Sequence, residues 1–160
     1  MTPDSRPDLD LEISRVIRAP RAKVWRAWAD PRRLEQWWVP APAQCRVEAL
    51  ELVPGGCFRT SIREGTGQFQ PHMDTCVLAV EEGRRIVFTD ALLAGWRPGD
   101  APFMTAVITM DDHPEGTGYV ARAMHRSRAE RDTHERLGFF AGWGTVTGQL
   151  AEFTEQEDPR

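Results

Sequence analysis

The C-terminal stretch, residues 130–155, is the feature that most restricts how this chain can fold. It contains no proline, and large apolar side chains recur at intervals of four, three, four and three residues: Phe139, Trp143, Val146, Leu150 and Phe153. This spacing predicts a single amphipathic α-helix of six or seven turns.

The region before this helix has the punctuation of an antiparallel meander. Apolar stretches alternate with turns rich in Gly, Pro and Asp, and they predict strands at 45–53, 57–64, 73–80, 85–92, 103–110 and 117–127. A further strand is expected near the start, where Leu9, Leu11 and Ile13 alternate with polar residues. The turn between the last two strands is expected at residues 111–116.

Two short helices are expected between the first strand and the meander. The first covers residues 21–29 after Pro20, and the second begins at Asp30-Pro31 and runs through Trp38. Successive antiparallel strands with helices at both ends predict an α+β fold rather than a parallel doubly wound sheet. We expect one domain at residues 9–153, with a flexible tail at 1–8 and a C-terminal tail at 154–160.

Composition excludes several classes of function. Hydrophobic residues make up 41% of the chain, as in ordinary globular proteins, and the net charge is −4 without any basic tract, so nucleic acid is not an expected partner. No stretch approaches the roughly 20 apolar residues of a membrane span. Cys45, Cys57 and Cys76 have no metal-ligand spacing, and no signal peptide is recognisable. Reduced thiols in the cytoplasm are therefore expected.

The C-terminal helix carries an unusual number of glycines, at positions 138, 142, 144 and 148. Each interior glycine costs roughly 1 kcal/mol of helix stability relative to alanine. Either the helix backbone approaches the sheet closely, or volume is left open beside the aromatic rings. Ala121 and Ala123, small residues on one face of the last strand, also leave room. An apolar recess with few polar groups is typical of small-molecule sites.

The histidines are the candidate catalytic residues. His125 is expected to face the recess, and His134 lies nine residues later, so the two are expected to approach each other at one end of it. Acid–base catalysis by His125, with Asp132 or Glu135 as its partner, is one reading. A metal site would draw on His72, His125 and His134 with Asp74 or Glu135. The spacing matches no known metal signature, so neither a metal nor a cofactor is predicted.

Several segments together resemble a known family. They are 18–28 (RAPRAKVWRAW), Asp30-Pro31, 34–38 (LEQWW), 54–56 (PGG) with Phe58, 85–89 (RIVFT), 134–139 (HERLGF) and 142–143 (GW). Over residues 9–153 the chain is similar to homologues of the activator of the heat-shock-protein-90 ATPase, within the START-like (SRPBCC) superfamily. The resemblance implies a helix-grip fold: a seven-stranded antiparallel sheet wrapped around the C-terminal helix, with two short helices after the first strand.

The leading functional hypothesis is that a small hydrophobic molecule, lipid or polyketide-like, binds between the sheet and the C-terminal helix. Alternatives left open are a polyketide cyclase/aromatase-like enzyme using a cavity histidine, and a chaperone-associated or homodimeric interaction module. Trp38 and Trp96 are expected at the pocket mouth or in a lid formed by residues 94–101. The complete set of expected ligand contacts is Trp38, Phe58, Ile62, Phe88, Trp96, Met104, Ile108, Tyr119, His125, Phe139 and Trp143.

Overall fold

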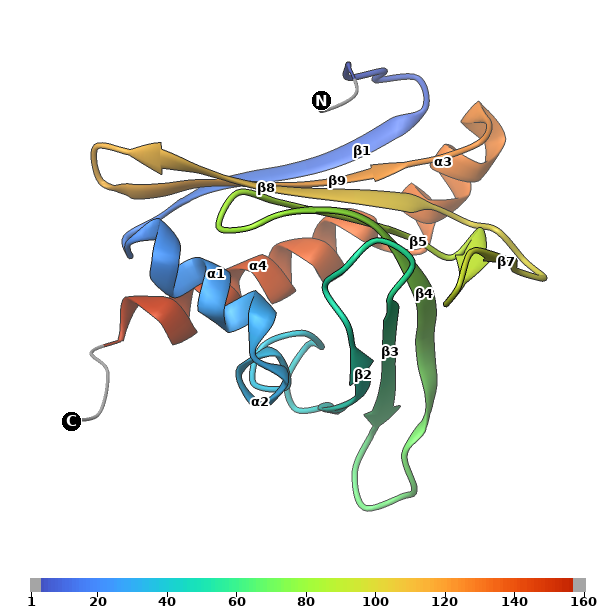
Figure 1. Ribbon diagram of the computed structural model, residues 1–160, viewed down its shortest axis with the longest axis horizontal. Coiled ribbons are helices and arrows are strands. Elements are labelled where there is room, and N and C mark those ends of the chain that lie inside the picture. The colour runs from blue at the N-terminus through green and yellow to red at the C-terminus, as the bar shows by residue number, and fades with distance from the viewer. Residues whose placement is uncertain (1–3, 157–160) are drawn as a thin grey trace.

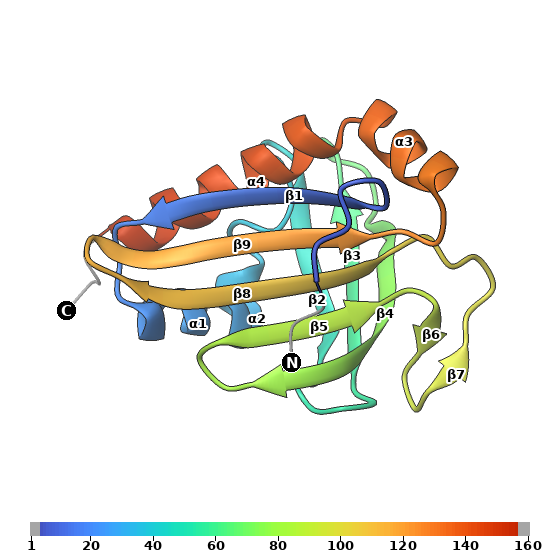
Figure 2. The same cartoon turned by 90° about the horizontal axis from the view of Figure 1, so that it is seen from above.

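A curved antiparallel sheet holds one long helix on its concave side, which confirms the expected α+β helix-grip fold (Figures 1 and 2). The computed structural model describes residues 4–156. The seven strands lie in the order β1-β9-β8-β5-β4-β3-β2. Their bounds are β1 Asp10–Ile17, β2 Gln44–Leu50, β3 Cys57–Arg63, β4 Gln70–Glu81, β5 Arg85–Thr89, β8 Thr105–His113 and β9 Gly116–Met124. The helices are α1 Arg21–Ala29, α2 Pro31–Leu34, α3 Arg128–Arg136 and α4 Phe139–Glu155.

Register shifts explain why the sheet bends around α4. The pairing slips between Val47 and Ala49 in β2, between Thr60 and Ser61 in β3, and between Val77 and Ala79 in β4. Such bulges bend and twist a strand locally. In Figure 1, β2, β3 and the lower part of β4 turn steeply away from β1, β9 and β8, and α4 lies inside the resulting curve.

The predicted continuous helix over 130–155 is wrong, because the chain breaks it into α3 and α4. Gly138 lies between them with φ +99°, a left-handed conformation that glycine adopts without steric cost. The segment before the break is polar and has no buried residue, so α3 gains little from the sheet. The turn at Gly138 lets the apolar α4 follow the sheet while α3 projects from it (Figure 2).

Other boundaries shift for local reasons. The second helix ends at Leu34, so Trp37 and Trp38 lie in the turns after it, although Asp30 caps its N-terminus as expected by accepting from the Arg32 amide. Strand β8 continues to His113, so the turn expected over 111–116 is shorter. Part of the expected loop over 94–101 belongs to a small hairpin of β6 (Leu92–Leu93) and β7 (Arg97–Pro98).

The C-terminal tail expected at residues 154–160 begins inside a helix. Helix α4 runs two residues past the expected domain end, to Glu155. Within the tails, residues 1–3 and 157–160 lie outside the described residues.

Five aromatic rings form the densest part of the core. Their centroids lie 4.9–6.3 Å apart, mostly in edge-to-face pairs, and the set comprises Trp28, Trp37, Trp38, Phe58 and Phe88. A second, smaller cluster of Leu11, Ala123 and Phe139 lies near the start of α4. On β8, Ala106, Ile108 and Met110 share one face of the strand and are all buried.

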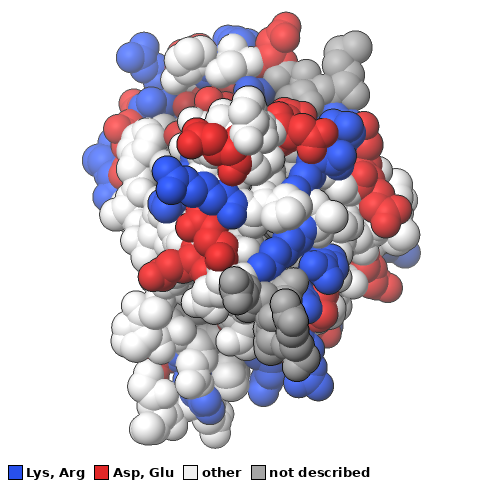
Figure 3. Space-filling model, turned by 90° about the vertical axis from the view of Figure 1, so that its left-hand side faces the viewer, with Lys and Arg blue, Asp and Glu red and all other residues white. Residues whose placement is uncertain are grey.

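The surface shows no segregated charge on the face drawn in Figure 3, where basic and acidic side chains are interleaved. Ion pairs also form between strands: Arg122 on β9 contacts Glu12 on β1 at 3.1 Å. Within residues 4–156, no helix is long and apolar enough to cross a membrane.

Candidate functional site

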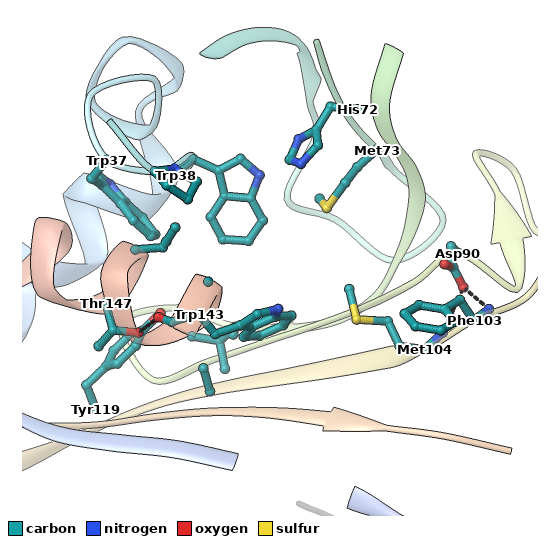
Figure 4. A pocket seen from close by; sticks show the side chains of 15 residues that line it. Trp37, Trp38, His72, Met73, Asp90, Phe103, Met104, Tyr119, Trp143 and Thr147 are labelled. Carbon is teal, nitrogen blue, oxygen red and sulfur yellow. Dashed lines mark hydrogen bonds between the residues drawn. The ribbon is translucent and has the colours of Figure 1, made fainter. Parts of the chain in front are cut away.

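A cavity of about 360 Å³ lies between α4 and the concave face of the sheet. Figure 4 shows the side chains that surround it. The turn after α2, strands β4, β8 and β9, the segment before β8 and helix α4 supply its walls. The lining residues are Trp37, Trp38, Pro40, His72, Met73, Asp90, Phe103, Met104, Ile108, Tyr119, Ala121, Gly142, Trp143, Val146 and Thr147.

The sheet side of the cavity follows from strand pairing. Ile108 on β8 lies opposite Ala121 on β9, and Met110 lies opposite Tyr119. Side chains on one face of paired strands are neighbours, so the small Ala121 leaves space beside larger residues. The phenol of Tyr119 accepts a hydrogen bond from Trp28 Nε1 at 3.1 Å, which anchors the ring at this wall.

Close packing does not account for Gly142, which borders open volume at the helix side of the cavity. A Cβ atom added at Gly142 would meet no atom within 4 Å outside the helix's own backbone, and the same holds at Gly138 and Gly144. Gly148 is different, because a Cβ there would lie 3.7 Å from Arg15 Nη1. Of these four glycines, only Gly142 lines the cavity.

Gln149 on α4 holds the turn that contains Trp37 and Trp38 against the helix. Its amide nitrogen donates to the carbonyl oxygens of Trp37 (3.0 Å) and Val39 (2.8 Å), and its oxygen accepts from the Ala41 amide at 2.8 Å. These three bonds satisfy backbone groups that have no regular partner in a turn. They position Trp37 and Trp38 over the cavity.

Asp90 plays a similar role at the opposite wall. Its Oδ1 accepts from the backbone amides of Phe103 (2.7 Å) and Met104 (3.0 Å), as the dashed lines in Figure 4 indicate. This carboxylate therefore fixes the backbone of two lining residues. It also places negative charge at the cavity wall.

His125 and His134 meet, as the sequence indicates. His125 Nε2 lies 2.8 Å from His134 Nδ1, and His125 Nδ1 lies 2.8 Å from the Leu9 carbonyl oxygen. A carbonyl oxygen only accepts, so Nδ1 of His125 carries a proton, and in the neutral pair Nε2 accepts from His134. Burial, together with the charge of His125, lowers the pKa of His134 to about 4. Both nitrogens of His125 are therefore occupied by protein groups.

The carboxylates expected beside this pair bond elsewhere. Asp132 and Glu135 both contact Arg131, at 3.1 and 2.5 Å. His72 is also separate, with its Nδ1 3.0 Å from Thr60 Oγ1 at the mouth of the cavity. Across residues 4–156, no group of three or more His, Cys, Asp or Glu side chains lies close enough together to hold a metal ion.

The cysteine thiols are unsuited to nucleophilic chemistry. All three are buried and free. Burial, reinforced by Glu35, raises the pKa of Cys45 to about 12, and burial also raises the pKa of Cys57. Reactive cysteines have lowered pKa values, so the opposite shift argues against a catalytic thiol.

Five of the eleven expected ligand contacts line the cavity: Trp38, Met104, Ile108, Tyr119 and Trp143. Phe58 and Phe88 are instead packed in the aromatic core with Ile62 against them, and Phe139 is buried in the smaller cluster near the start of α4. His125 lines a neighbouring recess of about 230 Å³, which shares Phe103 and Met104 with the cavity. Strand parity predicts which face of the sheet a side chain occupies. It does not predict whether an inward-facing side chain is packed in the core or lines the cavity.

Trp96 does not lie over the cavity as a lid. It is 51% exposed with φ 66°, and its indole covers Gly55, where a Cβ would come within 2.8 Å of Nε1. Among the lining residues that sequence reasoning missed, Val146 and Thr147 could have been found from helical spacing to Trp143. Asp90 and Phe103 carried no comparable signal.

Comparison with known proteins gives a consistent result. Residues 18–155 match the family described as Activator of Hsp90 ATPase homolog 1-like protein. A crystal structure of a protein from Nitrosomonas europaea is 38% identical, covers 93% of this chain and 96% of its own, and superposes with a TM-score of 0.84. No protein of curated function matches.

Two further solved structures are more distant. One from Chromobacterium violaceum is 26% identical, covers 93% of this chain and 99% of its own, and has a TM-score of 0.73. One from Mycobacterium smegmatis is 24% identical, covers 96% and 94%, and has a TM-score of 0.77, which shows a common fold.

Proposed function

Because the chain belongs to the Activator of Hsp90 ATPase homolog 1-like family, we propose that it binds a small hydrophobic molecule in the cavity beneath α4. Folds of this superfamily commonly hold such ligands. The observation that carries the proposal is the open volume beside Gly142, a position where alanine would stabilise the helix without any clash. Helix stability is given up where space for a ligand is gained.

The size and lining of the cavity support this function. A volume of about 360 Å³ falls within the range of small-molecule sites, roughly 300–1,000 Å³. Ile108, Met104 and Val146 offer hydrocarbon surface, and Trp143 offers an aromatic face. A lipid-like or polyketide-like molecule of moderate size suits these walls.

Neither alternative gains support from the described residues. A cyclase-type mechanism through His125 would need a nitrogen of that ring to reach the substrate, whereas both of its nitrogens are held, by Leu9 and His134. No observation favours a chaperone-associated or homodimeric module. We also propose a cytoplasmic location, which suits the three free cysteines.

The test is a titration of the purified protein with fluorene, a rigid apolar aromatic, followed by isothermal calorimetry. Gly142→Leu should fill the cavity and lower the affinity by tenfold or more, a loss of about 1.4 kcal/mol. Gly144→Leu is the matched control: it is also free of contacts within 4 Å but does not line the cavity, so it should bind fluorene as the wild type does.

Two results would contradict the proposal. One is the absence of binding to the wild-type protein. The other is an equal effect of the two glycine substitutions, because fluorene would then occupy some other part of the molecule.

A further inference from the structure

Trp38 carries the one polar group of the aromatic cluster that is left without a partner. Trp28 Nε1 donates to Tyr119 and Trp37 Nε1 donates to the Ala27 carbonyl oxygen. Trp38 is 8% exposed, and no group among residues 4–156 accepts a hydrogen bond from its Nε1. An indole N–H can only donate, and a buried donor without an acceptor lowers stability. A ligand acceptor would remove this defect.

Trp38, which carries the unpaired nitrogen, belongs to the cavity wall, and its nitrogen edge faces a second polar group. In Figure 4, Nε1 lies on the edge of the Trp38 ring that points toward His72, and both residues line the cavity. His72 Nδ1 is bonded to Thr60, while its Nε2 has no partner among the described residues. When the Thr60 hydroxyl donates to Nδ1, the neutral ring carries its proton on Nε2 and offers a second donor.

The charge around the cavity limits what these groups can bind. Asp90 contributes a carboxylate, and none of the described lining residues is a lysine or arginine. Burial lowers the pKa of His72, which favours its uncharged form. An anionic ligand would therefore meet negative charge without a compensating cation, which is unfavourable in a site of reduced dielectric.

We propose that Trp38 and His72 form the polar end of the cavity and bind an uncharged oxygen, a carbonyl or hydroxyl group, on an otherwise apolar ligand. This inference rests on the proposed function and specifies its ligand class. The Trp38 nitrogen is buried behind the cavity wall, so the indole turns slightly when the oxygen docks. The hydrocarbon part of the ligand then lies against Ile108, Ala121 and Val146.

The test compares 9-fluorenone with fluorene, two probes of nearly the same shape that differ by one carbonyl oxygen. Calorimetry should show that wild-type protein binds fluorenone at least about fivefold more tightly, the ratio expected from one neutral hydrogen bond. Trp38→Phe should reduce the ratio of the two affinities to about one, because phenylalanine has no N–H to donate to the carbonyl oxygen. Fluorene-9-carboxylate, the anionic analogue, should bind more weakly than either.

A second readout uses the wild-type protein alone. In a proton–nitrogen NMR spectrum, the Trp38 indole signal should move downfield with fluorenone and not with fluorene. The Trp28 and Trp37 indole signals are internal controls, because both groups already donate to protein oxygens.

The outcomes separate the two proposals. Equal binding of both probes, or an unmoved Trp38 signal when fluorenone is bound, contradicts the proposal that Trp38 and His72 bind a ligand oxygen. The proposed hydrophobic site is not affected by either result. Tighter binding of the carboxylate also contradicts the proposal for Trp38 and His72. Failure of both neutral probes to bind removes the proposed function and this inference with it.

Discussion

The two ends of the space between the sheet and α4 are closed in different ways. One end is solid: Trp28, Trp37, Phe58 and Phe88 are almost fully buried and their rings contact one another. The other end has only a small apolar cluster, centred on Phe139, beside the His125–His134 pair and the break at Gly138. The cavity lies between them.

Because of this difference, the two ends are expected to contribute unequally to the stability of the fold. Interlocked aromatic rings bury large areas and tolerate truncation poorly, so the solid end supplies most of the packing energy. The histidine end depends on a few polar contacts and a helix that projects from the sheet. We therefore expect substitutions at the first end to change folding, and changes at the second end and along the cavity to have smaller effects.

The largest effect is expected at the solid end. Trp28→Ala should lower the free energy of unfolding by about 3–5 kcal/mol, because it leaves a large cavity and removes the donor to Tyr119. Val146→Ala, at the wall of the existing cavity, should cost about 1 kcal/mol or less, since its side chain already lacks neighbours on one side. Urea unfolding followed by circular dichroism measures both. Similar losses for the two variants would remove the distinction between packed and open regions.

A smaller effect is expected at the histidine end when the pH is lowered. His134 has its pKa reduced from 6.5 to about 4 on folding, so the unfolded chain binds more protons than the folded one between these values. Stability should therefore fall as the pH drops through this range, by on the order of 1 kcal/mol because the ring is partly screened by solvent.

The contribution of His134 is isolated by comparison with His134→Gln. Urea unfolding at about pH 7 and about pH 4 should show a steeper loss for the wild type than for the variant. Parallel losses would mean that other groups, such as protonating carboxylates, account for the acid sensitivity.

The smallest effect is expected at the glycines of α4, between the two ends. Gly142→Ala and Gly144→Ala should each raise the free energy of unfolding by about 0.5–1 kcal/mol, because alanine favours the helix and a Cβ has no atom within 4 Å at either site. Thermal unfolding should show similar increases. A destabilised Gly142→Ala would indicate that the helix approaches the sheet more closely than the structure shows.

Local patterns in the sequence were enough to predict the seven strands of the sheet, the two short helices after the first strand and the overall architecture. Alternation marked the strands, proline and glycine marked the turns, and the apolar spacing from Phe139 to Phe153 marked α4. These signals are local because they reflect backbone conformation and the burial of one face. The sequence contains a signal for the break at Gly138, because a glycine follows a polar segment there. The aromatic spacing that continues through this region predicts an uninterrupted helix instead.

Only the tertiary structure decided which inward-facing residues pack and which surround a cavity. Phe58 and Ile108 both face inward on strands and both are buried in the core, yet only Ile108 also lines the cavity. The unpaired Trp38 nitrogen and the bond between His125 and His134 likewise depend on where bulges, turns and helices bring distant segments. Periodicity determines the face of a side chain, whereas depth and partner depend on long-range packing that no local pattern contains.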